Sequence, residues 1–141
     1  MQKKVLGPLL FGIGIIGMLD GIIFHQLLQW HSIYMYTDRF HQVMSDGWFH
    51  GFVTMVIFIA GILMWKTDPH EVKQTYFWGS FILGAGLFNF VEGIINHHIL
   101  QIHHVKPGRY QLLADILFDA VGLLLIIIGW LMLRRSKQQK N

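Results

Sequence analysis

The chain has 141 residues, of which 53% are hydrophobic and 13% charged, and its formal net charge is +3 with neutral histidines. That length suits one domain, and so little charge excludes an ordinary water-soluble surface. The absence of cysteine excludes disulfides, thiolate copper sites and iron–sulfur clusters. The basic residues lie mostly at the ends of apolar segments, which indicates membrane topology and no nucleic-acid binding. Nine histidines in so apolar a chain therefore need an explanation.

Four apolar segments are each close to the roughly 20 residues that a helix needs to cross a bilayer. In chain order they are predicted at about residues 5–28, 46–65, 76–103 and 111–133. The helix of the third segment is expected to continue to His103. A polar aromatic connection precedes Asp46, a short charged loop follows the second segment, and Pro107-Gly108 marks a turn before the fourth. The whole chain, residues 1–141, is therefore predicted to be one all-α membrane domain, a four-helix bundle in contact with the lipid bilayer.

With four spans, both termini lie on the same side of the membrane. The basic residues on that side are Lys3, Lys4, Lys66, Lys73, Arg134, Arg135, Lys137 and Lys140, whereas Arg39, Lys106 and Arg109 fall on the other side. Because loops rich in Lys and Arg stay in the cytoplasm, the N and C termini are predicted to be cytoplasmic. The chain is then expected to be a multi-pass protein of the plasma membrane.

A polar string near the outer end of the first span is repeated near the outer end of the third. Residues 11–31 align with residues 83–103, and both contain the pattern acid-Gly-Ile-Ile-x-His-x-aliphatic-Leu-Gln-x-His. Apolar matches alone mean little, because membrane helices resemble one another, whereas an acid, two histidines and a glutamine at fixed spacing indicate an internal repeat. Both copies run in the same direction, so we expect two parallel-repeat hairpins related by a pseudo-two-fold axis along the membrane normal.

Carboxylates and histidines gather at the outer ends of the four spans. No Lys or Arg lies inside the spans to neutralise the acids, and ionisable groups inside a membrane usually face a partner. Mixed imidazole and carboxylate ligands suit zinc, iron, manganese or copper(II), and helices that face one another can hold two such ions. The predicted metal ligands are Asp20, His25, His31, Asp46, His50, Glu92, His97, His103, His104, Asp115 and Asp119. We therefore expect a mono- or dinuclear transition-metal site that opens toward the outer face of the membrane.

On an α-helix of about 100° per residue, the polar residues of each copy divide between two stripes. In the first copy Asp20 and His31 share one face whereas His25 lies on another, and the second copy repeats this division. The bundle could bury one stripe and a homo-oligomer the other, or this end of the helix could stand partly out of the bilayer. His98 lies on neither stripe and is expected at the lipid headgroups, and His70 is expected in the cytoplasmic loop.

The same residues leave other functions open. A bound ion could activate water or dioxygen in an enzyme, or a carrier could pass it to a partner, and the sequence does not separate the two. In a haem protein His25 and His97 would be the axial ligands, although so many acids do not suit an apolar haem pocket. An ion relay would need polar groups in the cytoplasmic half, which is almost purely apolar. In the remaining alternative, the polar string is a structural hydrogen-bond network between helices.

The motifs that carry a resemblance to a known family are Asp20-Gly21, His25-Gln26, Gln29-Trp30-His31, Asp46-Gly47-x-Phe49-His50, Phe88-Asn89-x-x-Glu92-Gly93 and His103-His104-Val105-x-Pro107. Over nearly its whole length the chain resembles a family of small four-span bacterial inner-membrane proteins catalogued as a domain of unknown function. The resemblance implies the bacterial inner membrane as location and brings no established activity. Some members of that family sit beside or are joined to an assembly factor of caa3-type cytochrome oxidase, which implies oxidase assembly proteins as partners and copper or haem traffic. Many relatives are expected to have a second histidine directly after His31, where this chain has Ser32.

Overall fold

The computed structural model describes residues 3–67 and 73–138, and the regular structure in this part of the chain is all helical. Its helices are α1 (Lys3–Asp20), η1 (Gly21–Leu27), α2 (Arg39–Trp65), α3 (Gln74–Glu92), η3 (Gly93–Ile99) and α4 (Gln111–Gln138), where η denotes a π-helix. Because η1 continues α1 and η3 continues α3, there are 4 continuous helices long and apolar enough to cross a membrane. The predicted all-α class with four spans is therefore confirmed. His70 lies outside the described residues.

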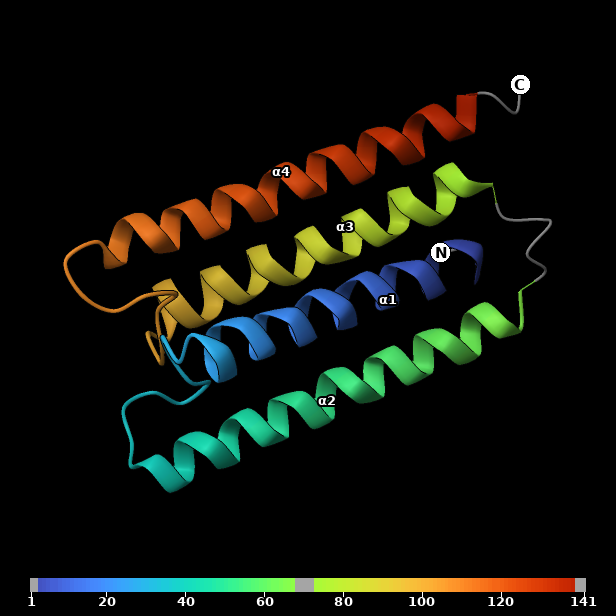
Figure 1. Ribbon diagram of the computed structural model, residues 1–141. Coiled ribbons are helices and arrows are strands. Elements are labelled where there is room, and N and C mark those ends of the chain that lie inside the picture. Colours follow the sequence, from blue (N-terminus) through green and yellow to red (C-terminus); the bar gives the residue numbers. More distant parts are fainter. Residues whose placement is uncertain (1–2, 68–72, 139–141) are drawn as a thin grey trace.

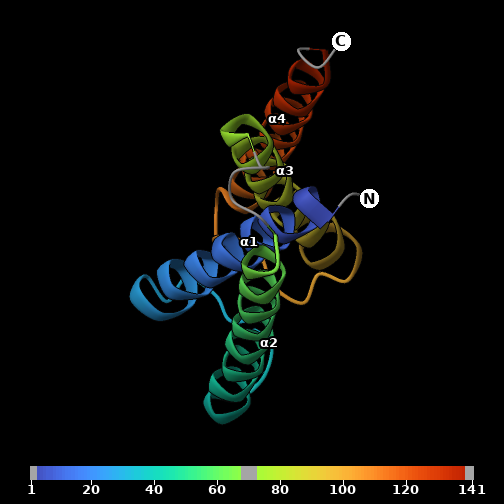
Figure 2. The same cartoon turned by 90° about the vertical axis from the view of Figure 1, so that its right-hand side faces the viewer.

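The four helices lie in a row and do not close into a bundle. α1 and α3 pack against each other in the middle, α2 packs along the other side of α1, and α4 packs along the other side of α3 (Figure 1 and Figure 2). The predicted four-helix bundle is therefore an open row in the order α2, α1, α3 and α4. A bilayer permits this open arrangement because lipid tails are as apolar as leucine, so the outer faces need no protein cover. Those faces expose large side chains such as Phe52 and Phe58 of α2 and Leu117 and Leu124 of α4.

Glycines determine how closely the two middle helices approach. A Cβ atom on Gly12 of α1 would overlap the backbone carbonyl oxygen of Phe81, and a Cβ atom on Gly84 of α3 would overlap that of Leu9. Each glycine thus lets the backbone of the other helix pass at a distance that a larger residue does not permit. This crossing joins the two hairpins, and the polar strings of α1 and α3 lie at the same end of the row (Figure 1).

Both middle helices end in a π-helical turn of 7 residues. Each turn is followed by a glutamine with left-handed backbone, Gln29 with φ 49° and Gln101 with φ 50°. A continuing right-handed helix does not accommodate such a residue. The prediction that the third helix continues to His103 is therefore wrong, because η3 ends at Ile99 and His103 belongs to the connection that follows.

α2 begins well before the predicted residue 46. The Asp38 side chain caps this helix by accepting a hydrogen bond of 3.1 Å from the backbone N–H of His41. The hydrogen bond from the His41 side chain, together with this backbone bond, holds the pKa of the Asp38 carboxyl below its usual range. Residues 39–45, predicted as part of a connection, are therefore the first turns of α2.

The start of α1 and the end of α4 lie at one end of the row, and the connections 28–38 and 100–110 lie at the other (Figure 1). The polar strings are thus next to the two connections, as four alternating spans require. The sequence assigns this end to the outer face of the membrane. That orientation and the internal repeat stay predictions.

Candidate metal centre

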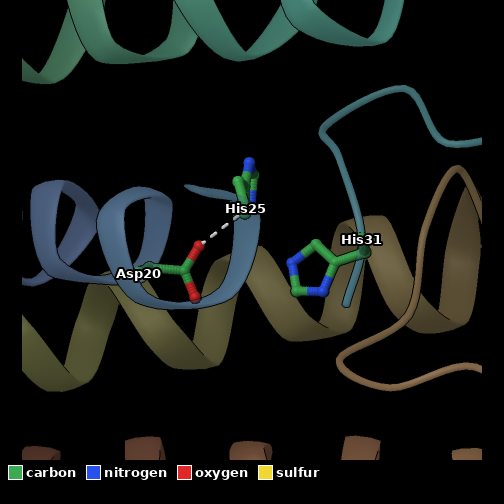
Figure 3. A group of neighbouring side chains, drawn as sticks. All are labelled: Asp20, His25 and His31. Atoms are coloured by element: carbon green, nitrogen blue, oxygen red, sulfur yellow. Dashed lines mark ion pairs between the residues drawn. The ribbon is translucent and has the colours of Figure 1, made fainter. Parts of the chain in front are cut away.

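The polar strings fold into two groups of three side chains. We name Asp20, His25 and His31 the first triad, and Glu92, His97 and His103 the second triad. Within each triad, one ligand atom from each residue lies within 4.8 Å of the other two, a spacing that can hold a metal ion. Figure 3 shows the first triad, in which the acid comes from the end of α1, the first histidine from η1 and the second histidine from the connection after it.

The π-helical turns bring the acid and the first histidine of each triad together. Hydrogen bonds in a π-helix join residues i and i+5, so side chains five positions apart come close to register. In the first triad, His25 Nε2 lies 3.4 Å from Asp20 Oδ2. In the second triad, His97 Nε2 lies 3.5 Å from Glu92 Oε1. The prediction of two separate stripes on each helix is therefore wrong, because it assumed α-helical geometry to the end of the string.

Several ligand atoms of the triads are buried without a hydrogen-bond partner. His25 is 3% exposed and His97 is 2% exposed. Nε2 of His25, both ring nitrogens of His97 and Oε2 of Glu92 have no hydrogen-bond partner in the protein. Because buried polar groups are normally satisfied, these unpartnered atoms are candidates to bind a cation.

The second histidine of each triad is held by the connection of the other hairpin. His31 Nδ1 donates to the carbonyl oxygen of Val105 at 2.8 Å, and His103 Nδ1 donates to the carbonyl oxygen of Ile33 at 3.0 Å. A carbonyl oxygen can only accept, so Nδ1 carries the hydrogen in both rings and the lone pair of the neutral ring lies on Nε2, the nitrogen available to an ion. The rings of His31 and His103 stack with their centroids 4.7 Å apart and an interplanar angle of 8°. The two triads therefore meet at this pair of rings.

Burial lowers the pKa of His31 to about 3, and the nearby His103 and His25 lower it in the same direction. This imidazole is 5% exposed and lies in the connection beyond the end of η1. It is therefore neutral at pH 7, which is the protonation state that a histidine needs to bind a metal.

Asp46 of α2 lies beside the first triad and holds two groups at once. Its Oδ1 accepts a hydrogen bond of 2.8 Å from His25 Nδ1 and another of 2.8 Å from the backbone N–H of Ile33. A carboxylate bonded to the far nitrogen of a metal-binding histidine fixes the tautomer and the orientation of the ring. Asp46 was predicted as a ligand, and its contacts suit it to orienting His25.

Asp115 of α4 has the corresponding place in the other hairpin, with an equivalent backbone partner but a different histidine. It accepts hydrogen bonds of 2.8 Å from His104 Nδ1 and 2.9 Å from the backbone N–H of Val105. His97 Nδ1 is 3.7 Å from Asp115 Oδ1, which is too far for a hydrogen bond. The buried Ser32 occupies in the first copy the position that His104 occupies in the second. Ser32 thus gives Asp46 a hydroxyl partner where His104 gives Asp115 an imidazole, and the first triad keeps all three of its members.

The other two predicted ligands, His50 and Asp119, lie outside both triads. His50 Nδ1 donates to the backbone carbonyl of Asp46 at 2.8 Å, and Asp119 Oδ2 lies 2.7 Å from His98 Nε2. His98, which was expected at the headgroups, therefore has a carboxylate partner that the sequence analysis missed. The error has the same cause as the two stripes, since His98 lies in η3 and the α-helical wheel misplaces it. A spacing of five between acid and histidine was the available signal for a wider helix.

Comparison with known families places this site in a membrane protein. A family model described as "Predicted membrane protein (DUF2243)" matches residues 7–136, a stretch that includes both triads and their aspartates. No curated protein and no solved structure matches the chain. The match extends over most of the chain, and the family description gives a membrane location without a function.

Proposed function

Because this chain belongs to the DUF2243 family of predicted membrane proteins, whose description names no activity, we propose a function from its side chains: the protein binds two transition-metal ions, one in each triad. The membrane location and the contact with the lipid bilayer follow from the family and from the four apolar helices. In the proposed orientation, both ions lie near the outer face of a bacterial inner membrane.

The distances between ligand atoms carry this proposal. Two atoms that each lie about 2.1 Å from a tetrahedral ion are about 3.4 Å apart, and in an octahedral site about 3.0 Å apart. The acid–histidine distances of 3.4 Å in the first triad and 3.5 Å and 2.8 Å in the second fall around these values. These acid–histidine distances therefore support one ion in each triad.

The hydrogen bonds of His103 add a second argument. Its Nδ1 donates to the carbonyl of Ile33, so a neutral ring turns the lone pair of Nε2 toward Glu92 Oε1, 2.8 Å away. Two lone pairs at that distance repel unless a positive charge lies near both. A metal ion supplies this charge to all three members of the triad, whereas a proton serves only one pair.

Two histidines and one carboxylate form a ligand set that non-haem iron(II) and catalytic zinc sites share. Three protein ligands leave at least one position for water or another small molecule. An ion in such a position can activate water or dioxygen, and the same opening lets a carrier hand the ion to a partner, such as the oxidase assembly proteins that the family resemblance suggests. Zinc and iron(II) are the preferred metals, with copper as the third.

Haem is the alternative cofactor, with His25 and His97 as axial ligands. The packing of the rings favours small ions, because the ring of His31 lies 4.5 Å from that of His25 and the ring of His103 lies 5.0 Å from that of His97, between centroids. A flat macrocycle between His25 and His97 would have to displace both neighbours.

The test is elemental mass spectrometry with an absorption spectrum, on protein purified in mild detergent without a histidine tag. Two equivalents of metal are expected in the wild type and about one in His25→Ala and in His97→Ala. His41→Ala is the matched control, because His41 is exposed and hydrogen-bonded to Asp38. A Soret band would support haem instead. Metal-free protein that stays empty after incubation with zinc and iron(II) would leave the triads as a hydrogen-bond network.

A further inference from the structure

We propose that the two triads form one coupled metal centre, in which each hairpin fixes ligands of the other, so that an ion in one triad raises the affinity of the other triad. The inference rests on the proposed metal binding and adds a linkage between the two sites. It also assigns Asp46 and Asp115 as the positioning residues through which this linkage acts.

A first chain of hydrogen bonds runs from α2 to both triads through Asp46. Its Oδ1 accepts from His25 Nδ1 of the first triad and from the backbone N–H of Ile33, both at 2.8 Å. The carbonyl of Ile33 in turn accepts from His103 Nδ1 of the second triad at 3.0 Å. One buried carboxylate thus orients a histidine in each triad, the first directly and the second through the backbone of one residue.

A second chain of hydrogen bonds runs from Asp115 of α4, in the second hairpin, to the first triad. Asp115 Oδ1 accepts from the backbone N–H of Val105 at 2.9 Å, and the carbonyl of Val105 accepts from His31 Nδ1 of the first triad at 2.8 Å. The same Oδ1 faces His97 Nδ1 of the second triad at 3.7 Å. Each chain of hydrogen bonds therefore reaches from one hairpin to the other, and the ligands of each triad are oriented in part by the other hairpin.

These two chains of hydrogen bonds link the binding of the two ions. An ion in the first triad fixes His31, and His31 fixes the carbonyl of Val105 and stacks on His103 at 4.7 Å between ring centroids. The side-chain and backbone freedom lost in this step no longer has to be lost when the second ion binds, so the second affinity rises. Linkage is reciprocal, so loading the second triad first has the same effect on the first triad.

Repulsion between two divalent cations opposes this effect, and the local charges decide the balance. Five carboxylates lie in or beside the centre, namely Asp20, Asp46, Glu92, Asp115 and Asp119, which acts on His97. Carboxylates in this number offset the positive charges of two divalent ions. The repulsion is therefore neutralised locally, and the shared ordering determines the sign of the coupling.

The experiment uses Co²⁺, whose absorption reports binding, on metal-free full-length protein in lipid nanodiscs. The wild type should bind two Co²⁺ with a sigmoidal isotherm, and His25→Ala should bind one, in the second triad. In that His25→Ala background, Asp46→Ala should lower the remaining Co²⁺ affinity about 10-fold, because it frees Ile33 and thereby His103. Asp46→Asn should restore the affinity, because the amide oxygen still accepts from Ile33 N–H. The control variant His41→Ala should change nothing.

The corresponding pair of variants in the other hairpin distinguishes a specific effect from misfolding of one variant. Asp115→Ala in a His97→Ala background should weaken Co²⁺ binding in the first triad by a similar factor, through Val105 and His31. Unchanged affinity in both backgrounds, with a hyperbolic wild-type isotherm, would overturn the coupling and leave metal binding intact. If the wild type takes up no Co²⁺, zinc or iron(II), the proposed function itself fails.

Discussion

The replacement Gly12→Ala tests whether the middle of the row is packed backbone to backbone. The new methyl group overlaps the carbonyl oxygen of Phe81, so α1 and α3 must move apart until the contact reaches about 3.5 Å. Overpacking costs about 1–3 kcal/mol, with the upper end expected where the obstacle is backbone that no rotamer change can move. Removing a glycine from a helix contributes about 1 kcal/mol in the opposite direction. We therefore expect Gly12→Ala to lower the free energy of unfolding by about 2 kcal/mol.

The assay is unfolding in mixed micelles with increasing sodium dodecyl sulfate, followed by helical circular dichroism. Gly61→Ala on α2 is the matched control, because nothing lies within 4 Å of a Cβ atom at that position. This control should be as stable as the wild type or slightly more stable. Gly12→Ala should also lose metal, because separating α1 from α3 separates the crossed contacts of the two connections.

Gly84→Ala should reproduce the defect, since its Cβ atom would meet the carbonyl of Leu9 in the same way. The reasoning is refuted if Gly12→Ala and Gly84→Ala unfold together with Gly61→Ala. In that case the two middle helices do not approach at these glycines, and the placement of the triads at their ends loses its basis.

Three further predictions concern the centre itself. Glu92→Gln keeps the size of the side chain but removes its charge, so the second triad should lose its ion while the helical content stays unchanged, as elemental analysis and circular dichroism would measure. In metal-free protein the pKa of His31 is about 3, well below that of the unfolded chain near 6.5, so the unfolded chain takes up a proton that the folded chain refuses. The contribution of His31 to the free energy of unfolding should therefore be fully present above pH 6.5 and be lost as the pH drops toward 3, whereas a contribution that is flat over this range would contradict the burial of a neutral ring. Gly93→Ala would place a Cβ atom on Asp119 Oδ1, so it should break the contact with His98 and shift that ring's NMR signals, with the first triad unaffected.

The apolar segments and the polar string are properties that the sequence determines by itself. Membrane helices satisfy their own backbone hydrogen bonds, so length and apolar composition are enough to locate four of them. Buried acids and histidines are costly in a bilayer, so their presence at the ends of spans already marked the candidate site. Both inferences depend on local chemistry. The four-span helical fold is confirmed, and the family match is to predicted membrane proteins.

Tertiary structure alone decided which of these residues meet. The helical wheel separated Asp20 from His25, and the π-helical turn brought them to 3.4 Å, because a change in hydrogen-bond register rotates every following side chain. The roles of Asp46 and Asp115 depend on backbone N–H groups in connections whose path no pattern of side chains specifies. The order of helices in the row likewise depends on the close approach of Gly12 to the backbone of Phe81 and of Gly84 to the backbone of Leu9, and such an approach between segments distant in sequence is a property of the folded chain.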